Sequence, residues 1–181
     1  MKIKSAPMKI PVFVSAPSSL SEEQQLSFDC IGRLLERENL EARALGRSDY
    51  PTDYPLKEVV MIARRCAGGV ILGYSQSVAP VLKIKPGVPL EEGEPPRKDG
   101  ENVKFPTPWN QLEAGILFSL RLPLIVFNEK GISGGIFDLG SSDVFIIPLP
   151  LGEISGKKEE QIVFSLQNWA ARVREHYRKW D

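Results

Sequence analysis

The sequence predicts an α/β fold in a single domain over residues 1–181, built on a parallel β-sheet. Short apolar runs alternate with longer segments of helical periodicity, which is the pattern of repeated βαβ units. The run LPLIVF at 122–127 is too apolar to leave one face in water, which indicates a central strand. The 181 residues, 42% of them hydrophobic, suffice for one sizeable core and about five βα units.

Each expected element is bounded by turn or capping residues. Strands are expected at 10–14, 41–45, 70–72, 122–127 and 144–149. Helices are expected at 21–38, 56–67, 107–120 and from about 157 to 180. Because parallel strands are joined by right-handed crossovers, this alternation predicts a flavodoxin-like three-layer sandwich with a five-stranded parallel sheet in the order 2-1-3-4-5. The switch point then lies between strands one and three.

A proline-rich insertion at 76–106 interrupts this alternation. It holds six prolines together with glycines and clustered charges, and it is longer than ordinary connections in α/β units. It is either a mobile solvated loop or a lid or partner-binding arm, and 81–84 can add a small edge strand. We expect this insertion to be the most mobile internal segment and the first to be cut in limited proteolysis.

The composition excludes several classes of function. Lys+Arg and Asp+Glu balance at 23 each, so nucleic acid is not an expected partner, and no apolar run approaches the ~20 residues of a membrane span. Cys30 and Cys66 fit reduced core thiols of a soluble, cytoplasmic protein. His176 is the single histidine, so a Ser-His-Asp triad or a multi-histidine metal site is not expected. We therefore expect neither a metal nor a cofactor.

The helix that starts at Thr107 carries the candidate catalytic acid. Thr107 suits the N-cap and Pro108 suits the first helical position. The expected apolar face consists of Leu112, Ile116, Leu117 and Leu120. Glu113 lies beside this face, on a helix that is almost uncharged until Arg121. Because Cα–Cβ bonds tilt toward a helix N-terminus, its carboxylate is expected to lean back toward Trp109 and the helix start.

The predicted topology brings Glu113 to the crevice at the carboxyl ends of the strands, where open α/β sheets bind ligands. The expected binding residues come from loops and element ends around this crevice: Ser15, Ala16, Pro17, Asp49, Asp53, Tyr74, Ser75, Trp109, Asn110 and Asn128. A carboxylate beside an aromatic ring, with no histidine, suits chemistry at a sugar anomeric carbon. The structural alternative is that Glu113 forms an ion pair or lies on an exposed face.

The segment from Thr107 to Glu113, TPWNQLE, resembles the Ser-x-Trp-Cys-x-x-Glu segment of TIR domains, in which the glutamate is the catalytic acid of the NAD-cleaving members. The frame is also similar to nucleoside 2-deoxyribosyltransferases, whose nucleophilic glutamate lies in an E-x-G-x-A-like helix, compared with Glu113-Ala114-Gly115 here. The resemblance spans roughly 10–149. Asn110 replaces the TIR cysteine, and the transferases' aspartate shortly before the glutamate is missing.

This resemblance implies cleavage or transfer at the N-glycosidic bond of NAD or a related nucleoside or nucleotide, with Glu113 as the catalytic carboxylate. NAD would be a substrate and not a cofactor. A TIR-like member would act in bacterial defence signalling and form a homo-oligomer, with Trp169, Tyr177 and Trp180 of the last helix as candidate contacts. A non-catalytic nucleotide-binding sensor or adaptor using the same crevice is the alternative. Hydrolysis, cyclisation and base exchange stay open.

Overall fold

The computed structural model describes residues 9–49, 53–83, 87, 89–90, 92, 100–140, 144 and 146–179. The helices are α1 (Glu22–Arg37), α2 (Pro55–Ala63), α3 (Pro108–Ser119) and α4 (Lys157–Arg178), with one short 3-10 turn, η1 (Gly135–Phe137). The strands are β1 (Ile10–Ser15), β2 (Leu40–Arg43), β3 (Gly69–Gly73), β4 (Ser77–Leu82), β5 (Gly100–Phe105), β6 (Leu124–Asn128) and β7 (Ile146–Pro148). Strands and α-helices therefore alternate, as predicted, except between β3 and α3, where the β4–β5 pair lies, and between β6 and β7, where only η1 lies among the described residues.

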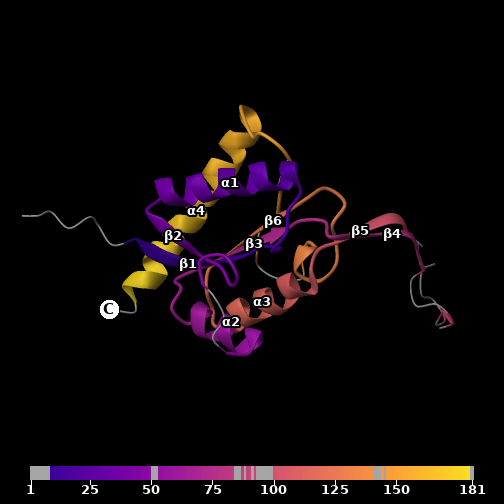
Figure 1. Cartoon of the computed structure of the whole chain (residues 1–181), viewed down its shortest axis with the longest axis horizontal. Helices are drawn as coiled ribbons and strands as arrows, with labels where there is room; N and C mark the ends of the chain where they lie inside the picture. Colours follow the sequence, from indigo (N-terminus) through magenta and orange to yellow (C-terminus); the bar gives the residue numbers. More distant parts are fainter. Residues whose placement is uncertain are drawn as a thin grey trace, which may run out of the picture.

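Five strands form one parallel sheet in the order β2-β1-β3-β6-β7. Counted along the chain without the β4–β5 pair, this is the predicted order 2-1-3-4-5, which is confirmed. Helices lie on both sides of the sheet, α1 and α4 on one side and α2 and α3 on the other (Figure 1). The chain leaves β1 toward α1 and reaches β3 from α2, so the switch point lies between β1 and β3, as expected.

Each face of the sheet has its own hydrophobic core, and β1 contributes to both. Val12 and Val14 pack with α1 and α4, whereas Phe13 packs with α2 and α3. This alternation is the period of two that a β-strand imposes. Because both faces are covered, the central strands β1, β3 and β6 are mostly apolar, which explains the composition of 122–127. Ser15 is next on the Phe13 side, so its side chain is directed toward the face that α3 covers.

The start of α3 agrees with its capping prediction, but its buried face does not. Thr107 Oγ1 accepts a hydrogen bond from the Asn110 backbone N–H at 3.3 Å, and Pro108 occupies the first turn. Leu112 was expected on the buried apolar face of this helix, and that expectation was wrong, because Leu112 is 50% exposed. The buried residues of α3 are Asn110, Glu113, Ala114 and Leu117. The helix is rotated so that two polar side chains, Asn110 and Glu113, face inward near its start.

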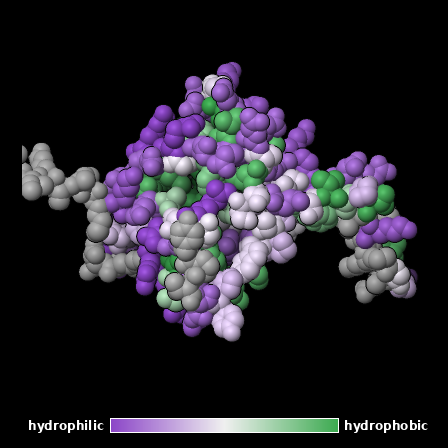
Figure 2. Space-filling model, in the orientation of Figure 1, coloured by the Kyte–Doolittle hydropathy of each residue, from purple (hydrophilic) through white to green (hydrophobic). Residues whose placement is uncertain are grey.

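The insertion at 76–106 forms a separate antiparallel hairpin. β4 pairs with β5 from Ser77↔Phe105 to Leu82↔Gly100, and neither strand joins the main sheet. Residues 81–82 of the expected small strand belong to β4, in this hairpin and not at an edge of the main sheet, and residue 84 lies outside the described residues. The hairpin projects from the body of the molecule (Figure 1). Hydrophobic surface is visible on it in Figure 2, where Val78 and Val81 are exposed. Part of the insertion lies outside the described residues (84–86, 88, 91 and 93–99), and its mobility stays a prediction.

Two further expectations concern the cysteines and the last helix. Cys30 and Cys66 are free and buried, as predicted, and burial raises the pKa of the Cys66 thiol to about 12. Trp169 was wrong as a candidate partner contact, because it is 4% exposed and its indole N–H donates to the Pro123 carbonyl at 2.9 Å. Tyr177 packs partly buried against the same core, and Trp180 lies outside the described residues. No helix in the described ranges is long and apolar enough to cross a membrane.

Candidate active site

A buried polar group lies where β1 ends and α3 begins. Ser15 is the last residue of β1, and Asn110 and Glu113 lie one turn apart at the start of α3. Ser15 and Asn110 are each 1% exposed and Glu113 is 8% exposed. The helix start and the strand order thus bring together three of the residues that the sequence placed at the crevice. Buried polar groups require partners, so their hydrogen bonds decide what the group can do.

The Asn110 amide orients the Ser15 hydroxyl. Asn110 Nδ2 donates to Ser15 Oγ at 2.7 Å and to the Leu72 carbonyl oxygen at 3.4 Å. A carbonyl only accepts, so the contact with Leu72 fixes which end of the amide is nitrogen. Ser15 Oγ therefore accepts from Asn110, and its own proton is available to Glu113, with which it hydrogen-bonds. The Asn110 Oδ1 atom is buried and has no hydrogen-bond partner among the described residues.

Glu113 is a buried acid that pairs with no cation among the described residues. Burial raises the pKa of its carboxyl from 4.5 to about 7, and the hydrogen bond from Ser15 opposes this change only in part. No salt bridge within the described part of the chain includes it, and it is not exposed, so neither form of the structural alternative is observed. A carboxyl group with a pKa near neutrality can change protonation state at physiological pH, as acid–base and nucleophilic catalysis require.

Trp109 offers an aromatic surface beside this acid. It precedes Glu113 by one helical turn, and it is 41% exposed whereas its neighbour Asn110 is buried. An exposed indole has a face on which a nucleobase can stack. The start of α3 therefore presents a buried carboxylate inward and an aromatic ring outward.

Glu129 is a second buried carboxylate at the same edge of the sheet, and the sequence reasoning missed it. Its side chain accepts from Lys104 Nζ at 2.7 Å, from the Ser75 backbone N–H at 2.9 Å and from Gln24 Nε2 at 3.0 Å. Burial acts to raise its pKa, but these donors together hold the pKa below its usual value. The sequence signal for Glu129 was its position just after the apolar run at 122–127, at the end of a predicted strand. Ionised Glu129 thus connects β5, the end of β3 and α1 through these hydrogen bonds.

Tyr74 is a correction to the predicted binding residues. It is fully buried on the α1 side of the sheet, and its hydroxyl lies 2.9 Å from Ser27 Oγ. Burial raises the pKa of this hydroxyl above its ordinary value. With no exposed surface, Tyr74 packs in the core and offers nothing to a ligand. The neighbouring Ser75 contributes its backbone N–H to Glu129.

The remaining predicted residues divide between the crevice rim and the loops around it. Ala16 is half-buried and Pro17 is buried, directly after Ser15. Asn128 Nδ2 donates to the Ile132 carbonyl at 3.1 Å and so closes the turn after β6. Asp49 pairs with Arg43, and Asp53 pairs with Lys57 four residues along. Neither aspartate hydrogen-bonds to Ser15, Asn110 or Glu113, so the structure does not bring these two acids to Glu113.

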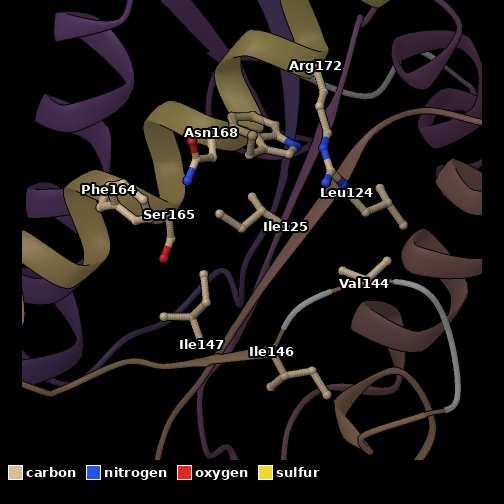
Figure 3. A pocket seen from close by; sticks show the side chains of 10 residues that line it. Leu124, Ile125, Val144, Ile146, Ile147, Phe164, Ser165, Asn168 and Arg172 are labelled. Atoms are coloured by element: carbon tan, nitrogen blue, oxygen red, sulfur yellow. The ribbon is translucent and has the colours of Figure 1, made fainter.

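A separate cavity lies elsewhere in the molecule. It has a volume of about 470 Å³ between β6, β7 and α4, and Figure 3 shows the side chains that line it. Its lining is mostly aliphatic and aromatic, with Ser165, Asn168 and Arg172 as its polar members, and it contains no carboxylate. None of Ser15, Asn110 and Glu113 lines this cavity. This cavity is therefore separate from the buried polar group, and the candidate site rests on Glu113 and its neighbours. No group of three or more potential metal ligands occurs among the described residues.

The fold and the buried group define an α/β protein with an acid at the switch point of a five-stranded parallel sheet. No protein-family profile and no curated protein sequence matches the chain. The structure is similar to that of Clostridium botulinum CMP N-glycosidase, BcmB, with a TM-score of 0.50 and 15% sequence identity. The match covers 88% of this chain and 98% of that one. At this identity the similarity establishes a shared fold.

Proposed function

We propose that the protein cleaves the N-glycosidic bond of a nucleotide or nucleoside, or transfers the glycosyl group to an acceptor, with Glu113 as the catalytic carboxylate. The observation that carries this proposal is a buried acid without a cation, whose pKa is about 7, at the carboxyl edge of β1. The fold similarity to a CMP N-glycosidase supports it. So does the resemblance of 107–113 to TIR domains and of Glu113-Ala114-Gly115 to deoxyribosyltransferases. We take the fold to be a flavodoxin-like three-layer sandwich.

In the proposed reaction, ionised Glu113 attacks the anomeric carbon or stabilises the positive charge that develops there. The electron pair of the N-glycosidic bond leaves with the base, which then takes up a proton. Water or another acceptor then bonds to the same carbon, displaces the Glu113 carboxylate where that has bonded, and releases a proton that balances the one taken up by the base. Ser15 holds the carboxylate in place through its hydroxyl, Asn110 orients Ser15, and Trp109 stacks against the base. These groups require no metal and no cofactor.

The finer features of the proposal come from the resemblance. NAD, nucleosides and nucleotides are candidate substrates, and hydrolysis, cyclisation and base exchange differ only in the acceptor. A TIR-like role in bacterial defence signalling, a homo-oligomeric state and a cytoplasmic location belong to the same proposal. Asn128 and Ser75 are retained as rim residues of the binding site.

The test is product analysis with Glu113→Gln and a matched control. The chain is incubated with CMP, cytidine, deoxycytidine and NAD, and released bases and sugars are separated. Glutamine keeps the size of the side chain but cannot ionise, so the rate should fall by about 10² to 10⁴-fold or more. Glu160→Gln, an exposed change on α4, should leave the rate unaltered. A folded Glu113→Gln protein with the wild-type rate would show that the catalytic assignment is wrong, and tight binding without turnover would favour the sensor or adaptor.

A further inference from the structure

Arg47 is held in place beside the chain that follows β1. It follows β2, and its Nη2 atom donates to the Pro17 carbonyl oxygen at 2.8 Å. Its guanidinium lies over the ring of Phe28 in α1, with 4.4 Å between Cζ and the ring centroid. Stacking and the hydrogen bond together fix the plane of the guanidinium. A flexible surface arginine would have neither constraint.

Within the described residues, no acid neutralises the charge of Arg47. It forms no salt bridge there, and Nη2 is its one nitrogen atom with a hydrogen bond in those residues; Nε is buried without an acceptor, so Nη1 and Nη2 are the atoms that a ligand can reach. A guanidinium carries five N–H donors, and a buried donor without an acceptor lowers stability. The other cations near this edge are occupied, since Lys104 pairs with Glu129 and Arg43 pairs with Asp49. Arg47 therefore has donors and charge available for an anion.

Arg47 and Glu113 flank the end of β1 from opposite faces of the sheet. Arg47 stacks on α1, which covers one face, and Glu113 belongs to α3, which covers the other. Pro17, which binds Arg47, follows Ser15, which binds Glu113, by two residues. Two residues of extended chain span at most ~7 Å, so Ser15 and Pro17, which bind Glu113 and Arg47, lie close together. A ligand lying across the end of β1 would meet the carboxylate on one side and the guanidinium on the other.

We propose that Arg47 binds the phosphate of the substrate, so that the site prefers nucleoside monophosphates over the corresponding nucleosides. The inference rests on the proposed function for the bond that is broken, but it assigns a separate part of the ligand to a separate residue. A planar guanidinium fits two phosphate oxygens at once, and charge-assisted hydrogen bonds of this kind are the strong ones. Arg47 is thus a specificity-determining residue, remote from the reacting carbon.

The test measures binding without turnover. Full-length Glu113→Gln protein is titrated calorimetrically with CMP and AMP, and with cytidine and adenosine. Adding Arg47→Met, which keeps the length of the side chain, should weaken binding of the two nucleotides by about 10- to 100-fold. Binding of the nucleosides should change by less than about twofold. Arg37→Met, at the far end of α1, is the matched control and should alter neither.

Several outcomes would overturn the assignment. They are an equal loss for nucleotides and nucleosides, the same loss in the Arg37→Met control, and the lack of any nucleotide binding at millimolar concentration. If Arg47→Met does not fold, two other variants test the same contact. Arg47→Lys keeps the charge but removes the planar guanidinium. Phe28→Leu removes the aromatic ring on which the guanidinium stacks. Each should reduce nucleotide binding selectively. A failure of wild-type protein to cleave any substrate would refute the proposed function but leave this nucleotide preference measurable.

Discussion

Replacing Glu113 by glutamine should stabilise the protein at alkaline pH. Burial raises the pKa of Glu113 from 4.5 to about 7 in the folded state, whereas the unfolded chain keeps the ordinary value. Between these pH values the folded protein retains a proton that the unfolded chain releases, so the free energy of unfolding falls as pH rises. The stability that the protonated Glu113 carboxyl preserves is fully present below about pH 4.5 and is lost above about pH 7. At about 1.4 kcal/mol per pH unit, the loss amounts to roughly 3 kcal/mol.

Glutamine does not ionise, so the variant should escape this loss. Urea unfolding of both proteins at pH 5 and pH 8 should show the variant gaining about 2–3 kcal/mol on wild type between the two pH values. Glu129→Gln provides the contrast. The pKa of Glu129 is held low, so its ionised form contributes stability that is lost only as pH falls below the ordinary range. Its destabilisation should be nearly constant from pH 5 to pH 8. A constant difference for Glu113→Gln as well would refute the account of a desolvated acid.

Two further variants test the surroundings of Glu113. Ser15→Ala removes the hydrogen bond that opposes the effect of burial, so the pKa of Glu113 should rise further above its ordinary value, which carboxyl-carbon NMR titration measures; an unchanged titration midpoint would mean that Ser15 does not donate to Glu113. Trp109→Ala removes the exposed stacking surface, so KM should rise by about 5- to 100-fold with a smaller change in kcat. An equal fall in kcat with constant KM would place Trp109 in the chemical step instead.

The sheet and its order were predictable because their determinants are local. Apolar runs of strand length, the capping residues Ser21 and Thr107, and the handedness of crossovers together restrict the topology to few choices. Strand periodicity, which is also local, argues against Tyr74 as a binding residue. Val70, Leu72 and Tyr74 alternate along one face of β3 and its continuation, and all three lie in the α1-side core. Strand periodicity therefore assigns Tyr74 to the core and not to the crevice.

The site was predictable only in part, because its polar residues disturb the patterns that locate elements. Asn110 and Glu113 occupy inward positions of α3, so the apolar residues of the helix do not mark its buried face, and Leu112 was misplaced. The pairing of Glu129 with Lys104 joins residues 25 positions apart, and Lys104 belongs to the inserted hairpin. No spacing rule connects them. Such a contact follows from the tertiary path of the chain.

A comparison of the two buried carboxylates at this edge of the sheet explains why we propose Glu113, and not Glu129, for the chemistry. Glu129 is surrounded by an ammonium, an amide and a backbone N–H, so it stays ionised and its free energy is already lowered by protein contacts. Glu113 has one hydroxyl partner and no cation in the described structure, so ionising it is unfavourable. An ionised Glu113 gains most when positive charge develops beside it. A glycosyl centre that loses its base develops that charge, and the cost of burying the acid is then recovered in the transition state.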